Sequence, residues 1–214
     1  MKHPLWSDEY WLLLMQLYLK KPMGVKPLYS KAMVDLALEL HIPPQFLYEQ
    51  SFRLRSIDTP RLEKLWETYA GNPNKLRRAV RLLRSRQGYG NANEFYDGVE
   101  VNESFERDFK PIDSETGLTP LMLILILDLY FRLTPPVMIA NTPEIVELAK
   151  LMGVSPRLVV EVMEAYQGID PYLRRASVSD VPYLDALRQV WNRFGNDSPQ
   201  KLAAQAAQMK EYFK

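Results

Sequence analysis

Residues 142–163 read TPEIVELAKLMGVSPRLVVEVM, a pattern that predicts two helices joined by a sharp corner. Ala149 is small enough to let the second helix approach closely, and Gly153 can adopt the left-handed conformation that ends the first helix. Ser155-Pro156 then supplies a capping residue followed by a proline, which is a helix start. This order is typical of a helix-turn-helix corner.

The same pattern occurs 112 residues earlier in the chain, where residues 30–51 read SKAMVDLALELHIPPQFLYEQS. His41 takes the place of the glycine. Histidine is among the residues enriched at positive φ, so we interpret His41 as a turn residue. The register holds without a gap between residues 6–61 and residues 118–173. This long but weak match predicts a tandem duplication.

Helix starts are marked six times by a capping residue that is followed directly by proline. Between these starts, apolar residues recur at intervals of three and four, as on the buried face of a helix. The predicted fold class is therefore all-α, with two tandem duplicated units of about five helices each and a helix-turn-helix-like corner in both. The predicted helices cover residues 7–20, 30–40, 44–55, 60–69 and 73–85, then 120–133, 143–152, 156–167, 180–194 and 199–213.

Charge divides the chain into three domains. Residues 1–86, a basic helical unit, hold 15 Lys and Arg against 8 Asp and Glu. Residues 87–117, an acidic linker that contains Gly and Asn, hold 2 against 8, and residues 118–214, the second helical unit, hold 10 against 10. We expect the linker to be packed down, with a short extended piece at 99–101. Such an uneven charge distribution is informative about binding partners, not about the fold. The carboxylates of the linker are candidates to bind to the basic unit and cover its cations.

Several functional classes find no support in the composition. The chain has no cysteine, which excludes disulfides, thiolate metal sites and cysteine nucleophiles. The most apolar stretch, 118–133, is interrupted by Asp128 and Arg132, whereas a membrane span needs about 20 apolar residues. The N-terminus lacks the apolar segment of a secretory signal. We therefore expect a cytoplasmic protein without a membrane partner.

Motifs for catalysis and ligand binding are also missing, because the chain contains no P-loop, dinucleotide fingerprint, nucleophile elbow or zinc-binding helix motif. We expect no enzyme, no cofactor, no metal and no small-molecule ligand. A small metal-dependent nuclease is the remaining enzyme alternative, since Asp108-Phe109-Lys110 after Glu100 has the acidic and lysine residues that hold magnesium and activate water. Such a site needs strands to present it, and this region reads as acidic loop.

Cations crowd the helix predicted at 73–85. A rotation of about 100° per residue places Arg77, Arg81 and Arg84 on one stripe, opposite the apolar residues. Guanidinium groups suit phosphate oxygens, although a solvated surface and an acidic protein partner are alternatives. Alanines stand opposite Arg77, Arg78 and Arg81 in the second copy, so the fold does not require the basic stripe. The candidate nucleic-acid-binding residues are Gln45, Arg53, Arg55, Lys75, Arg77, Arg78, Arg81 and Arg84.

Both corners resemble the helix-turn-helix of bacterial DNA-binding proteins. The resemblance implies that the second helix of a corner presents donors such as Arg, Asn or Gln to the major groove of DNA. In the second copy Arg157 stands against Glu161 and Glu164, so that helix is unfit for DNA. The corresponding helix of the first copy is better suited to DNA, because it carries Gln45, Arg53 and Arg55 against one acidic residue, Glu49.

A broader likeness covers residues 6–70 and is carried by scattered aromatic and apolar positions. They resemble the helical region that precedes the catalytic domain in some bacterial endonucleases of the His-Asn-His type. That nuclease motif needs several histidines, whereas this chain has only His3 and His41, so the resemblance implies the accessory module without its enzyme. The positions are Trp6, Glu9, Leu14, Tyr18, Ala37, Leu40, Pro44, Ile57, Asp58 and Trp66.

These observations predict a non-enzymatic binding module. The basic N-terminal unit is the part expected to bind DNA. The alternative is a protein–protein interaction scaffold with no nucleic-acid role, in which both corners serve only packing.

Overall fold

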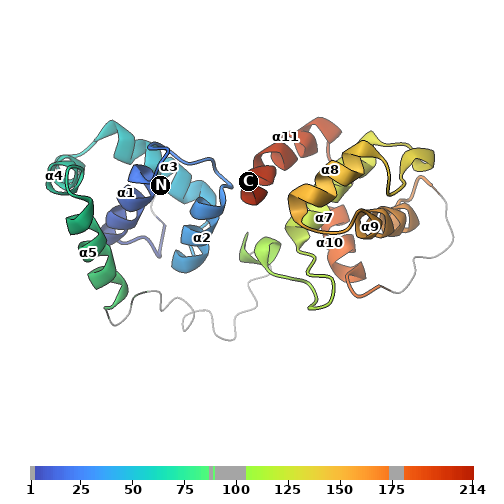
Figure 1. The fold of residues 1–214 in the computed structure, drawn as a ribbon, viewed down its shortest axis with the longest axis horizontal. Helices are drawn as coiled ribbons and strands as arrows, with labels where there is room; N and C mark the ends of the chain where they lie inside the picture. Colours follow the sequence, from blue (N-terminus) through green and yellow to red (C-terminus); the bar gives the residue numbers. More distant parts are fainter. Residues whose placement is uncertain (1–2, 87–88, 90–104, 174–180) are drawn as a thin grey trace. The chain divides into compact units, whose positions relative to one another are not determined.

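The computed structural model of the chain describes residues 3–86, 89, 105–173 and 181–214. It divides into two compact units, Met1–Ser104 and Phe105–Lys214, whose helices Figure 1 labels. The described residues form helices and contain no strand, which confirms the predicted all-α class. The extended piece expected at 99–101 lies outside the described residues.

In the first unit, the central helix α1 packs on α2, α3 and α5, and α4 packs on α5. The core between them includes Trp11, Leu14 and Met15 of α1 with Met33 and Leu47. The elements are η1 (Asp8–Tyr10), α1 (Trp11–Leu19), α2 (Lys31–Leu40), α3 (Pro44–Ser56), α4 (Pro60–Tyr69) and α5 (Pro73–Arg84).

In the second unit, the central helix α7 packs on α8, α9, α10 and α11, and η2 lies against it as well. Helices α8, α9 and α11 hold the same places after α7 as α2, α3 and α5 hold after α1. The tandem duplication itself stays a prediction. The elements are η2 (Phe105–Phe109), α7 (Pro120–Arg132), η3 (Pro135–Val137), α8 (Pro143–Met152), α9 (Pro156–Ile169), α10 (Leu184–Phe194), α11 (Pro199–Met209) and η4 (Lys210–Phe213).

The central helix of the second unit, α7, is buried on every side. Leu121 and residues 123–130 are all buried, including Asp128, whose carboxylate pairs with Arg132 at 2.9 Å. A helix of this composition needs partners all round. None of the helices in the described ranges is both long enough and apolar enough to cross a membrane.

The predicted helix starts are confirmed at all six proline-marked positions. In four of them the capping side chain accepts a hydrogen bond from a backbone N–H of the first turn, at Thr59, Asn72, Thr119 and Ser155. The ends differ more. The helix predicted over 199–213 stops at Met209 and continues as η4, the one predicted from residue 180 begins at Leu184, and the first opens as a 3-10 turn.

Both corners turn on a residue in the left-handed conformation, with φ of 54° at His41 and 72° at Gly153. The N–H of the following residue donates to Ala37 O in the first corner and to Ala149 O in the second, at 3.1 and 3.0 Å. These bonds satisfy carbonyls that the helix end would otherwise leave unpaired. The interpretation of His41 as a turn residue is confirmed.

Gly153→Ala is expected to lower the free energy of unfolding of the second unit by about 1 kcal/mol, because a left-handed conformation costs an L-residue about 1–2 kcal/mol. An added Cβ would meet nothing within 4 Å, so the cost is conformational. Gly71→Ala is the matched control, since its Cβ is equally free but its φ is not positive. Urea denaturation, followed by amide NMR signals of the substituted unit, measures both; equal losses would contradict this explanation.

Candidate nucleic-acid interface

Helix α5 presents the largest group of candidate cations to solvent. Asn72 caps it by accepting from Lys75 N at 3.0 Å, and Pro73 takes the first helical position. Leu76, Val80 and Leu83 form its buried face. The cations therefore lie on the remaining surface, as the periodicity predicts, and all of them are exposed: Lys75, Arg77, Arg78, Arg81 and Arg84.

Arg84 does not extend freely from this surface, because it is held by a carboxylate of α2. Its Nε and Nη2 donate to Glu39 Oε1 and Oε2 at 2.6 and 2.8 Å, a bidentate pair. This hydrogen bonding raises the pKa of Arg84 above its usual value. The Tyr89 hydroxyl also donates to Glu39, and burial together with this contact raises the pKa of Tyr89. The charge of Arg84 is thus neutralised within the unit.

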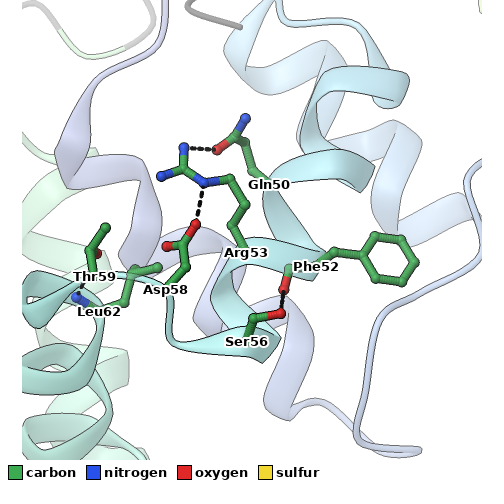
Figure 2. A network of polar contacts seen from close by, with 7 residues as sticks. All are labelled: Gln50, Phe52, Arg53, Ser56, Asp58, Thr59 and Leu62. Atoms are coloured by element: carbon green, nitrogen blue, oxygen red, sulfur yellow. Dashed lines mark hydrogen bonds and ion pairs between the residues drawn. The ribbon is translucent and has the colours of Figure 1, made fainter.

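Arg53, near the C-terminal end of α3, is held in the same way (Figure 2). Its Nε donates to Asp58 Oδ2 at 2.8 Å and its Nη1 donates to Gln50 Oε1 at 3.2 Å. Its guanidinium carbon lies 5.8 Å from the ring centroid of Trp11. Ile57, at φ 49°, ends α3 in a left-handed turn directly before Asp58. Arg53 therefore serves the packing of its own unit.

The outer face of α3 is aromatic and acidic. Gln45 Nε2 donates to Glu49 Oε1 at 3.1 Å, so the amide is occupied next to an exposed carboxylate. The rings of Tyr48 and Phe52 lie 5.0 Å apart, and Phe52 is 41% exposed. Arg55 is also exposed and, within the described part of the chain, has no ion pair or hydrogen bond. A helix that reads bases presents free donors near its start. Here Gln45 near the start is engaged, and Arg55 lies in the last turn of α3.

The candidate residues therefore separate into two groups, Gln45, Arg53 and Arg55 on α3 and the other five on α5. On α5, Arg77 donates to Asn74 Oδ1 at 3.0 Å and Lys75 lies 5.5 Å from the ring centroid of Tyr69. Arg78 and Arg81 are exposed, and no described residue forms an ion pair or hydrogen bond with either side chain. Three residues apart, they share the outer side of α5.

A groove of about 690 Å³ opens beside α5 in the first unit. It is lined by α1, α2, α5 and the loop after α1, with Leu17, Leu36 and Leu76 among its apolar residues. Met23, 69% exposed, lies in that loop. Sequence reasoning missed this groove, because Leu17 and Leu36 have the spacing of ordinary core residues.

The acidic residues of the nuclease alternative serve other contacts. Asp108 accepts two hydrogen bonds from Arg193, at 2.7 and 3.0 Å, and Glu106 pairs with Lys110 at 3.4 Å. These residues lie in or beside η2, which belongs to the second unit, while Glu100 lies outside the described residues. Among the described side chains, no group of three His, Asp or Glu residues is placed to hold a metal ion.

Comparison of the chain with protein-family models, with curated proteins and with solved structures finds no match. The resemblances to helix-turn-helix segments and to the accessory region of His-Asn-His endonucleases therefore stay predictions. Function has to be argued from the site itself.

Arg53→Gln is expected to lower the free energy of unfolding of the first unit by about 1 kcal/mol, since it removes a half-exposed ion pair and a cation–π contact. It also removes the partner of Gln50, which is 3% exposed. Arg78→Gln, the matched control on α5, should change it by less than about 0.5 kcal/mol. Urea denaturation of both variants decides the matter, and a neutral Arg53→Gln would show that the network has no structural role.

Proposed function

We propose that the chain is a non-enzymatic binding module whose first unit binds the phosphate backbone of nucleic acid through the outer face of α5. The observation that carries the proposal is the state of Arg78 and Arg81. Both are exposed on one side of the helix, and no described carboxylate neutralises them. Lys75 and Arg77 precede them on the same helix.

These residues favour binding to the phosphates of nucleic acid without recognition of the bases. Arginine forks fit phosphate oxygens and release counterions on binding. Base recognition would fall to α3 in a helix-turn-helix protein, yet Gln45 is bonded to Glu49 and Arg53 to Asp58. We therefore expect weak dependence on nucleotide sequence and strong dependence on salt.

The test is fluorescence anisotropy of labelled duplex DNA with the full chain, at a series of salt concentrations. Four phosphate contacts should give a slope of log K against log salt of about −3.6. Reversing both Arg78 and Arg81 to Glu should weaken binding at least about tenfold and reduce the magnitude of the slope by about 2.

The matched control is Lys150→Glu combined with Arg157→Glu, which changes the same charge at exposed positions of the second unit. It should bind DNA as the unaltered chain does, apart from a small effect of net charge. Equal weakening in both double variants would mean that only overall charge matters. Absence of binding even at low salt would remove the nucleic-acid function.

A protein-interaction scaffold is the second candidate. The observation that favours it is the exposed face of α3, where Phe52 and Ile57 are each 41% exposed beside Tyr48 and Glu49. Apolar and aromatic side chains gathered at a surface are typical of protein interfaces. This candidate becomes the better one if the DNA experiment gives no binding.

A further inference from the structure

We propose that the groove beside α5 is a docking site for a short helical segment of a partner protein, in which aromatic side chains are flanked by carboxylates. The groove has a volume of about 690 Å³ and is partly open to solvent. This is within the range of pockets that receive side chains or ligands, about 300–1,000 Å³.

The lining of the groove favours apolar side chains. Four leucines from α1, α2 and α5 line it, and Met23 contributes an exposed, flexible thioether. Apolar surface gathered in a concave site is costly to leave in water, so it is a typical place for a partner to bind. The leucines are Leu13, Leu17, Leu36 and Leu76.

The second unit provides a covered counterpart of this surface. Its central helix α7 contacts α8 and α11, as α1 contacts α2 and α5 in the first unit. There η2 lies on α7, and η4 lies on α8 and α11. The rings of Phe109 and Tyr212, one from each segment, lie 5.1 Å apart. Short helical turns that carry aromatic residues thus complete the second unit.

The difference is visible at matched positions of the two central helices. Leu129 of α7 is fully buried, whereas Leu17, which aligns with it, is only half-buried. Asp128 is buried, whereas the aligned Gln16 is half-buried and lines the groove. In the described ranges of the first unit, η1 lies on α1, and no 3-10 helix follows α5 as η4 follows α11. We therefore expect the groove of the first unit to bind a short helical segment with aromatic side chains, like the segments that pack on the second unit.

The charged residues at the rim of the groove indicate which charges the partner should carry beside its aromatic residues. Lys20 and Arg77 line the groove as exposed cations, while Arg84 is already neutralised by Glu39. Lys26 donates to the backbone oxygen of Lys20 at 2.6 Å, which adds a second ammonium at that end. Asp35 is the opposing charge on the rim. The balance favours carboxylates, which η2 and η4 also carry at Glu106, Asp108 and Glu211.

The probe is a 12-residue amidated peptide built on the pattern of residues 105–109, FERDF, and titrated into the isotope-labelled full chain. NMR shifts should saturate at groove residues of α1, α2 and α5, with a Kd below about 1 mM. Met23→Glu and Lys20→Glu should each raise that Kd at least about tenfold.

The matched controls lie outside the groove. Leu82→Glu, at a leucine that is 60% exposed on α5, and Lys31→Glu, at an exposed lysine of α2, should leave the Kd within about twofold. Circular dichroism verifies that each variant is folded. An equal loss in the control variants, or no saturable shift at all, would overturn the proposal.

Other possible ligands of the groove would give different results in these experiments. Unchanged affinity for a peptide in which both phenylalanines are serine would show that only charge attracts it. Saturable binding of decanoate with displacement of the peptide would assign the groove to small amphiphiles, and self-association lost in Met23→Glu would assign it to a second copy of the chain. Each result overturns the proposal. Failure of nucleic-acid binding is separate, because it concerns Arg78 and Arg81 on the outer side of α5.

Discussion

Each unit depends on burial of a central helix that is apolar on more than one side. In α7, residues 123–130 are all buried, which requires neighbours around the whole circumference. Four helices and η2 supply them. In α1 the residues of the last turn, 16–19, are only half-buried. A central helix with an incompletely covered side leaves an apolar surface, and the groove of the first unit follows from this single constraint.

Carboxylates decide which cations of the first unit act outward. Glu39 engages Arg84, Asp58 engages Arg53, and other pairs of this kind lie elsewhere on the surface. Such exposed pairs contribute at most about 1 kcal/mol each, so their effect on stability is small. Their effect on the surface potential is larger, because each one cancels a charge that the composition counts as basic. The outward field of α5 therefore depends on which arginines are unpaired and not on how many it contains.

Local signals made the helices and corners predictable. A capping residue before proline fixes a helix start within a few bonds, and the left-handed residue at His41 or Gly153 fixes its end, so no distant contact is needed. Which arginines pair with carboxylates was not predictable. Glu39 and Arg84 are 45 residues apart and meet only because their helices both pack against α1. The groove escaped prediction for a related reason: periodicity identifies an apolar face but not whether another element covers it.

Arg77 belongs to both proposed surfaces, since it lines the groove and also adjoins Arg78 on α5. A partner carboxylate that pairs with Arg77 would remove one cation from the face offered to phosphates, which changes the salt dependence by about one contact. Linkage makes the effect reciprocal, so bound nucleic acid would weaken the partner to the same degree. The coupling stays small because Arg78 and Arg81 do not line the groove. A shared side chain at the border would thus make the two proposed ligands compete without excluding each other.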